Sequence, residues 1–205
     1  MSDADICNLA LSAFGSARIR SLDDANETAN LCTLWYPQVR NEVLVETGVR
    51  WQPAKARAQL SELSTTPTFG WDHQYQLPAD LLRLDYVTDE EVITLDYISY
   101  QTADAKYVSW EREGDVILSN WDTCYILYIK LLTDTAKFTP LMIEAIYTKL
   151  GAALAGKLAQ NRQAQERLLL FYRQDVLPRA KAANNQEVYV PNEGGADDWS
   201  DTGRY

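Results

Sequence analysis

The sequence predicts a mixed α+β fold, in which an antiparallel helical bundle carries an inserted, mainly antiparallel β-sheet and an extended C-terminal tail. Apolar residues recur at three- and four-residue spacing near both ends of the chain, as in amphipathic helices. Between these regions, aromatic and β-branched residues cluster between turn residues, as in strands. We therefore expect two N-terminal helices over residues 1–49, a β region over 50–138, a C-terminal helical hairpin over 139–183 and a flexible tail over 184–205.

The N-terminal region is expected to hold two helices of the bundle. The first covers about residues 3–14, because its apolar residues fall on one face and Gly15 supplies a common stop signal. The second follows the helix-start signals Ser21 and Asp24. Pro37 lies inside its apolar pattern and removes a backbone donor, so we expect a kink or a break just before this residue.

The middle region is expected to form one sheet. Glu113-Gly114 is a hairpin turn signal between two of its strands. The strand candidates are residues 82–87, 92–100, 106–111, 115–118 and 124–132.

The C-terminal hairpin begins at a clear helix-start signal. Thr139 is expected to cap a helix with Pro140 at its first position, where the missing N–H costs no hydrogen bond. The apolar pattern lapses near residues 160–163, and a further helix with Leu168 and Tyr172 on its inner face follows. The two helices therefore predict a helical hairpin.

Charge and composition exclude several classes of protein. The 205-residue chain has a net charge of −10, and tight nucleic-acid binding depends largely on Lys and Arg that neutralise phosphates. No apolar run approaches the roughly 20 residues of a membrane helix, and residues 1–5 lack the positive charge of a secretory leader. We expect a soluble protein that is cytosolic when made, with no membrane partner. Its three cysteines are expected to be buried and reduced.

His73 is the only histidine, so a Ser-His-Asp or Cys-His mechanism would have to use it. No G-x-S-x-G motif accompanies it, no Cys or His pair has the spacing of zinc ligands, and there is no phosphate-binding loop. We therefore expect no catalytic residue, no metal and no cofactor, and a loop or hydrogen-bonding role for His73. The alternative is a small hydrolase that uses His73 with the neighbouring Asp72.

An acidic cluster at a strand end has an ordinary and a functional interpretation. Asp85, Asp89, Glu90 and Glu91 could bind a hard cation through their oxygens. Carboxylates at a strand end are normally solvated, and we expect a solvated turn.

Small residues form one face of the helix that Thr139 caps, so another helix can approach it closely. The ordinary interpretation is packing within the chain. The functional one is a contact between subunits through Gly151, Ala155 and Gly156.

The C-terminal tail contains residue types that dominate protein interfaces, in a segment with no core to join. They are Tyr189, Trp199, Arg204 and Tyr205. Aromatic residues in such a segment commonly fold upon a partner, so we expect the tail to dock on one. A tail with no role is the alternative.

Several segments together resemble a known family. They are Phe14-Gly15, Ile19-Arg20-Ser21-Leu22-Asp23-Asp24, Glu27-Thr28-Ala29, Trp35-Tyr36-Pro37, Val39-Arg40, Arg50-Trp51 and Tyr75-Gln76-Leu77-Pro78-Ala79-Asp80-Leu81-Leu82-Arg83-Leu84. Over nearly the whole chain, the sequence is similar to the tail tubular protein A family, the head-to-tail adaptors of short-tailed bacteriophages. It departs from that family at Gln52-Pro53-Ala54, so the resemblance does not establish a strand at these residues.

The resemblance implies a structural virion protein with no enzymatic activity. It implies a homo-oligomeric ring of twelve copies, assembled in the host cytoplasm and seated between the portal protein and the tail nozzle. The ring would line the channel through which DNA passes without specific binding, and the acidic body suits such a channel. The tail would dock on the portal. Apart from the resemblance, we expect the hairpin around Gly114, with Trp110 and Trp121 nearby, to face the nozzle. A host-surface binding module of the tail remains an alternative.

Overall fold

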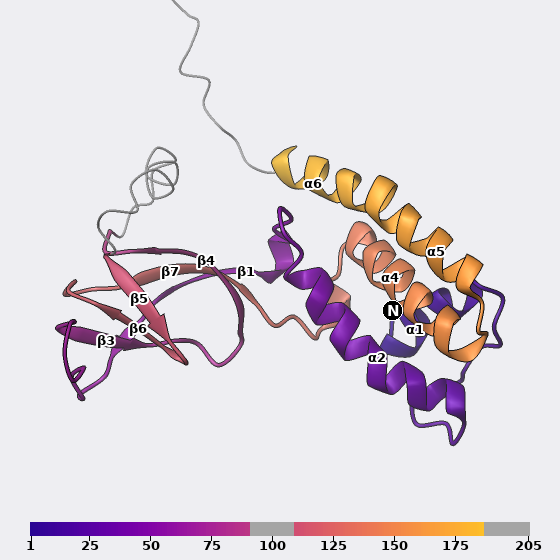
Figure 1. Ribbon diagram of the computed structural model, residues 1–205, viewed down its shortest axis with the longest axis horizontal. Coiled ribbons are helices and arrows are strands. Elements are labelled where there is room, and N and C mark those ends of the chain that lie inside the picture. Colours follow the sequence, from indigo (N-terminus) through magenta and orange to yellow (C-terminus); the bar gives the residue numbers. More distant parts are fainter. Residues whose placement is uncertain (91–108, 187–205) are drawn as a thin grey trace, which may run out of the picture.

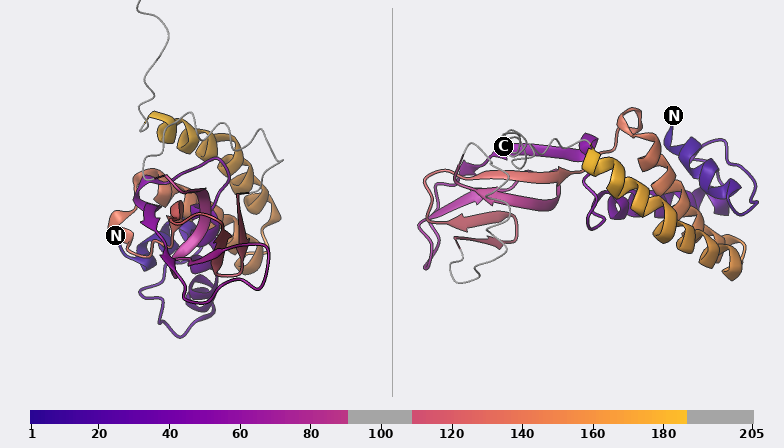
Figure 2. Two further views of the ribbon diagram at one scale, coloured as in Figure 1. Left: turned by 90° about the vertical axis from the view of Figure 1, so that its left-hand side faces the viewer. Right: turned by 90° about the horizontal axis from the view of Figure 1, so that it is seen from above.

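The computed structural model describes residues 1–90 and 109–186 (Figure 1). These residues form a mixed α+β fold with two antiparallel sheets, which confirms that the fold is of the α+β class. The sheets lie at one end of an elongated molecule and the helices at the other (Figures 1 and 2). The strand candidate at 92–100, residues 106–108 of the next candidate, and the tail from residue 187 lie outside the described residues.

Helix α1 (Asp3–Ser12) starts at a capping box and ends close to its predicted stop. The Ser2 side chain accepts a hydrogen bond from the Asp5 backbone, and the Asp5 carboxylate accepts one from the Ser2 backbone. These bonds lower the pKa of Asp5. Gly15 has a φ of +78°, a conformation that favours glycine.

Helix α2 (Glu27–Leu44) begins later than predicted. Asn26 caps it by accepting a hydrogen bond from the Ala29 backbone. Asp24 instead accepts two backbone N–H groups of the preceding turn, including that of Ser21. The helix continues past Pro37 as one element, so the alternative of a break there is wrong.

Helix α4 (Pro140–Leu158) begins as predicted, because the Thr139 hydroxyl accepts a hydrogen bond from the Met142 backbone and Pro140 takes the first position. It packs against α1, α2 and α5 and is the central helix of this end of the molecule (Figure 1). Helix α5 (Arg162–Phe171) follows after a short break capped by Asn161.

Helix α5 continues through a π-helical turn (Tyr172–Val176) into α6 (Leu177–Gln186). The Leu177 N–H donates to the carbonyl of Tyr172, five residues earlier. We attribute this widened turn to Pro178, which has no N–H and whose ring clashes with the carbonyl four residues before it in a regular helix. The hairpin therefore extends to Gln186, three residues beyond its predicted end at 183.

The described strands form two sheets, where we predicted one. The three-stranded sheet has the order β1-β7-β4 and the four-stranded sheet the order β2-β3-β6-β5, with every neighbouring pair antiparallel. Short 3-10 turns, η1 (Gln52–Ala54) and η2 (Thr135–Lys137), flank the β region. The strands are β1 (Lys55–Gln59), β2 (Ser61–Glu62), β3 (His73–Gln76), β4 (Leu81–Thr88), β5 (Trp110–Glu113), β6 (Val116–Ser119) and β7 (Tyr125–Lys130).

The two ends of the molecule have separate hydrophobic cores. One core lies among the helices, and the other lies between the sheets. Strand β7 contributes to both, because Ile126 and Tyr128 belong to the sheet core whereas Ile129 belongs to the helical core. Successive residues of a strand point to opposite faces, so β7 can join the two cores.

Candidate functional site

His73 lies on β3 between two carboxylates. Its Nδ1 is 2.7 Å from Oε1 of Glu62 on the neighbouring β2, and its Nε2 is 3.8 Å from Oδ1 of Asp122. The hydrogen bond with Glu62, followed by the negative charges of Glu62, Asp122 and Asp72, raises the pKa of His73. The site therefore favours the protonated imidazole.

The surroundings of His73 do not resemble a nucleophile with its general base. In the part of the chain that the structure describes, His73 forms no hydrogen bond with a hydroxyl or thiol. Ser119 is its cross-strand partner, but the Ser119 hydroxyl is buried and accepts a hydrogen bond from the Trp121 backbone. Asp72 is exposed, and its backbone N–H donates to Asn120. His73 has the hydrogen-bonding role that we expected, on a strand rather than in a loop.

The prediction that Asp85 belongs to a solvated turn is wrong. Its side chain is only 5% exposed, and Oδ1 accepts a hydrogen bond from Arg83 Nε at 2.7 Å. Oδ2 lies 3.1 Å from Arg50 Nε, outside hydrogen-bonding geometry, so this second contact is electrostatic. Two arginines compensate the buried charge, and one of them comes from a segment 35 positions earlier in the sequence.

Arg83 also reaches from the sheet to the helices. Its Nη1 donates to the carbonyls of Val45 and Glu46 at 3.0 and 2.9 Å, and its Nη2 donates to the carbonyl of Val49 at 3.1 Å. These carbonyls lie at or just beyond the C-terminal end of α2, where they have no intrahelical donor and where positive charge is favourable. We call Arg83, Asp85 and these three carbonyls the Arg83 brace, because they tie β4 to α2.

The two tryptophans of the predicted nozzle-facing hairpin are half-buried and pack against the sheet core. Trp110 lies on β5, and the Trp121 carbonyl accepts a hydrogen bond from the Tyr75 hydroxyl. The turn between β5 and β6 contains Gly114, with a φ of +54°. The exposed side chains that β5 presents near this turn are charged, including Glu113. A partner would therefore meet charge as well as aromatic surface.

The small-residue face of α4 packs within the chain. A Cβ atom at Gly151 would lie 3.0 Å from the carbonyl oxygen of Ala10 on α1, and Ala155 is fully buried. A Cβ atom at Gly156 would meet the side chain of Gln165 on α5 at 2.9 Å. A second copy could reach Gly151 and Ala155 only if α1 and α5 moved away.

An apolar pocket of about 250 Å³ lies where three segments meet beside the end of α6. Sequence analysis missed it, because the three segments are far apart in the chain and each has an unremarkable local pattern. Its lining residues are Arg50, Trp51, Gln52 and Pro53 around η1, Thr139, Pro140 and Leu141 at the start of α4, and Ala180 and Ala183 on α6.

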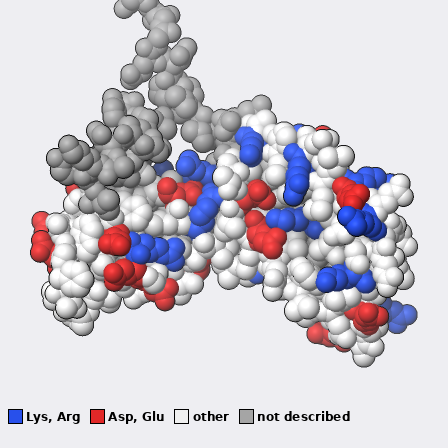
Figure 3. All heavy atoms as spheres, in the orientation of Figure 1, with Lys and Arg blue, Asp and Glu red and all other residues white. Residues whose placement is uncertain are grey.

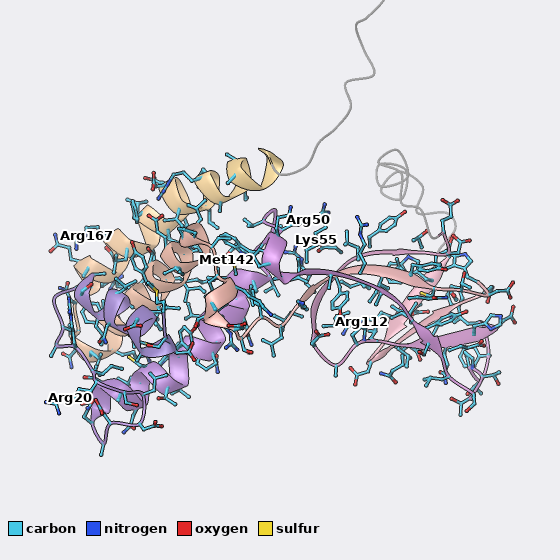
Figure 4. All side chains as sticks on the ribbon, turned by 180° about the vertical axis from the view of Figure 1, so that it is seen from behind. Arg20, Arg50, Lys55, Arg112, Met142 and Arg167 are labelled. Carbon is cyan, nitrogen blue, oxygen red and sulfur yellow. The ribbon has the colours of Figure 1, made fainter. Side chains whose placement is uncertain are left out.

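One basic side chain lines this pocket, and a second lies next to the first. Arg50 lines it, and Arg50 and Lys55 lie close together at the junction of sheets and helices, below the end of α6 (Figure 4). Burial, followed by the positive charges of Arg57 and Arg50, lowers the pKa of Lys55. The Lys181 side chain of α6 packs against Gly48, and a Cβ atom added at Gly48 would lie 3.1 Å from Lys181 Cε. Lys and Arg atoms are also prominent on the helical end in Figure 3.

Neither a metal centre nor a membrane span is found in the described ranges. Within residues 1–90 and 109–186, no three His, Cys, Asp or Glu side chains come together as a metal site would require. Asp89 and Glu90 are exposed, and Glu91 lies outside these ranges. No helix described here has the length and apolarity to cross a membrane.

The predicted docking residues of the tail, Tyr189, Trp199, Arg204 and Tyr205, lie outside the described residues. No protein-family model matches this chain, and no curated protein matches it significantly.

Proposed function

We propose that this chain is a structural head-to-tail adaptor of a short-tailed phage virion. Copies of it would form a ring between the portal protein and the tail nozzle and would line the DNA exit channel. The observation that carries the proposal is the Arg83 brace, which joins a helical end and a sheet end into one elongated body. An adaptor needs two docking ends held at a fixed spacing, and the brace supplies such a connection.

In this proposal the helices of residues 1–49 and 139–183 form an antiparallel bundle into which the β region 50–138 is inserted. The bundle would face the portal. The tail 184–205 would dock on the portal through Tyr189, Trp199, Arg204 and Tyr205. The net charge of −10 supports a channel role, because an acidic wall repels phosphates and lets DNA slide without adhering.

The sheet end would meet the nozzle through the hairpin of β5 and β6. Because Trp110 and Trp121 support the sheet core, replacing them would test folding as well as binding. The exposed Glu113 is a cleaner probe. Glu113→Lys should weaken nozzle binding, whereas Asp23→Lys, with the same charge change in an exposed loop of the helical end, should leave it unchanged. Equal nozzle recruitment by wild type and Glu113→Lys would count against this assignment.

Light scattering of the purified chain, alone and mixed with the portal protein, tests the function as a whole. A large complex of defined mass that forms only with portal supports an adaptor whose ring is assembled on the portal. A ring formed by the chain alone keeps the adaptor function and removes the need for a template. A mass that portal does not change rejects the proposal.

Truncation after Gln186 tests the role of the tail in the same measurement. This end point keeps α6 complete. The truncated chain should keep its far-ultraviolet circular dichroism and lose most of its portal binding. Portal binding equal to that of the full chain would remove the tail from the proposed interface.

A further inference from the structure

The pocket beside α6 has apolar walls and a basic rim. Trp51, Pro53, Pro140 and Leu141 contribute most of its large apolar side chains. Its volume of about 250 Å³ is that of roughly eight water molecules in the liquid, at ~30 Å³ each, which suits one aromatic ring. Such a mostly apolar cavity with few polar groups is typical of a site that receives a side chain or small ligand.

The rim carries more positive than negative charge. Arg50 lines the pocket, and Lys55 lies close to Arg50 (Figure 4). The acidic residue among them is Asp85, whose carboxylate is already held by Arg83 and Arg50. An acidic segment at this rim would reduce the repulsion among the cations, so the site favours an occupant with carboxylates beside an apolar or aromatic group.

The chain itself supplies such a segment next to the pocket. Residues 184–205 contain five acidic side chains and one basic one, and Tyr189 lies between Glu187 and Glu193. The last described residue of α6, Gln186, is three positions beyond Ala183, which lines the pocket.

The connecting length is sufficient for this segment to reach the pocket. At 1.5 Å per residue, the end of α6 lies about 4.5 Å along the helix axis from Ala183 and about 9 Å from Ala180. The three residues from Gln186 to Tyr189 span up to about 10 Å when extended. A chain that reverses direction after Gln186 can therefore bring the Tyr189 ring to the pocket.

We propose that, in the free protein, residues 187–193 fold back over the end of α6 and place the Tyr189 side chain in this pocket. Glu187 and Glu193 then face the basic rim. A short tether gives an effective concentration on the order of millimolar, so even a weak intrinsic contact is populated. This docked state does not depend on the adaptor function. If both hold, the portal competes with the pocket for the tail.

Chymotrypsin cleavage of the full-length chain after Tyr189 tests the proposal. Release of residues 190–205 is followed by mass spectrometry, and cleavage after the 86% exposed Phe69 serves as an internal reference for protease activity. An intrinsic dissociation constant of about 0.1 mM against a millimolar effective concentration protects Tyr189 about tenfold, because cleavage tracks the undocked population. Ala183→Glu introduces a negative charge into the pocket and should abolish this protection.

Ala182→Glu is the matched control, because Ala182 is the exposed neighbour on the same helix and does not line the pocket. It should keep the protection of the wild type. Equal cleavage rates in wild type and Ala183→Glu overturn the proposal, as does equal acceleration by both variants. Protection that increases with protein concentration also overturns it, because the pocket then holds the tail of a second copy. Circular dichroism confirms that each variant is folded.

Discussion

Arg83 and Asp85 lie two residues apart on β4, and Nε of the arginine donates to Oδ1 of the aspartate at 2.7 Å. The register of β4 against β7 shifts between Leu84 and Tyr86, so Asp85 lies at an irregularity of the strand, close to Arg83 in the chain. The rest of the same guanidinium binds carbonyls at the end of α2. One side chain therefore compensates a buried charge and connects the sheets to the helices.

Replacing Arg83 should strongly destabilise the protein. Arg83→Ala leaves the Asp85 carboxylate buried with Arg50 as its remaining charged contact and removes three hydrogen bonds to carbonyls, so we expect a loss of about 3 kcal/mol in the free energy of unfolding. Arg83→Lys keeps the charge but loses the planar guanidinium. Its free energy of unfolding should lie between those of the wild type and Arg83→Ala. Urea unfolding measures all three proteins.

Arg57→Ala is the control, because Arg57 is an exposed arginine on β1, which belongs to the same sheet as β4. It should change the free energy of unfolding by no more than about 0.5 kcal/mol. If Arg83→Ala were as mild as Arg57→Ala, the brace would have no energetic role.

Two glycines of α4 should respond in opposite directions to the same substitution. Each Gly→Ala change inside a helix gains about 1 kcal/mol in helix propensity. At Gly151 the new Cβ meets a backbone carbonyl of α1 at 3.0 Å, which cannot move away alone, so we expect net destabilisation of about 1–2 kcal/mol. At Gly156 it meets the end of the Gln165 side chain, which can rotate, so we expect equal or greater stability.

Thermal unfolding of Gly151→Ala and Gly156→Ala measures this contrast directly. If the unfolding midpoint temperature of Gly151→Ala were at or above that of Gly156→Ala, α1 would not restrict side-chain size at position 151 of α4. Both residues lie on the same helix, so helix propensity alone predicts the same change in stability for the two variants.

The single histidine makes the Glu62 contact directly measurable. Because the hydrogen bond with Glu62 raises the pKa of His73 above 6.5, the protonated imidazole stabilises the folded state. This contribution is fully present below pH 6.5 and is lost as pH rises through the raised pKa. An NMR titration of the imidazole should give a pKa above 6.5, and Glu62→Gln should lower it. An unchanged pKa in Glu62→Gln would reject the contact.

Local sequence signals predicted the helix ends well where the cap is built from neighbouring residues. Thr139 and Pro140 mark the start of α4 because cap and first turn are adjacent in the chain. Asp24 and Ser21 misled because such side chains also bind backbone N–H groups of a turn, as the Asp24 carboxylate does with Ser21 and the Ser21 hydroxyl does with Asp23. The true cap of α2, Asn26, lies two residues further on.

The sequence could not reveal features that depend on distant segments. Strand β1 reads Lys-Ala-Arg-Ala-Gln and β3 reads His-Gln-Tyr-Gln, neither of which is rich in β-branched residues, and both are fixed by pairing with β7 and β6. The charge of Asp85 looked solvated because Arg50 approaches it only in the folded chain. The pocket beside α6 combines three segments for the same reason.

The three cysteines should report separately on the two cores. Cys7 and Cys32 belong to the helical core and Cys124 to the sheet core, and all three are buried as free thiols. Burial, followed by the charge of Asp89, raises the pKa of Cys124 to about 12, so little reactive thiolate forms near neutral pH. In the native protein, each thiol should react with a labelling reagent only when its core opens.

Labelling with iodoacetamide at increasing urea, read by peptide mass spectrometry, tests this expectation. If the Arg83 brace makes the two cores one cooperative unit, wild-type Cys7 and Cys124 become reactive over the same urea range. Arg83→Ala should separate them, with Cys124 labelled at lower urea than Cys7, because the sheet core is the smaller of the two. Coincident labelling in Arg83→Ala would show that β7, which contributes to both cores, couples them without the brace.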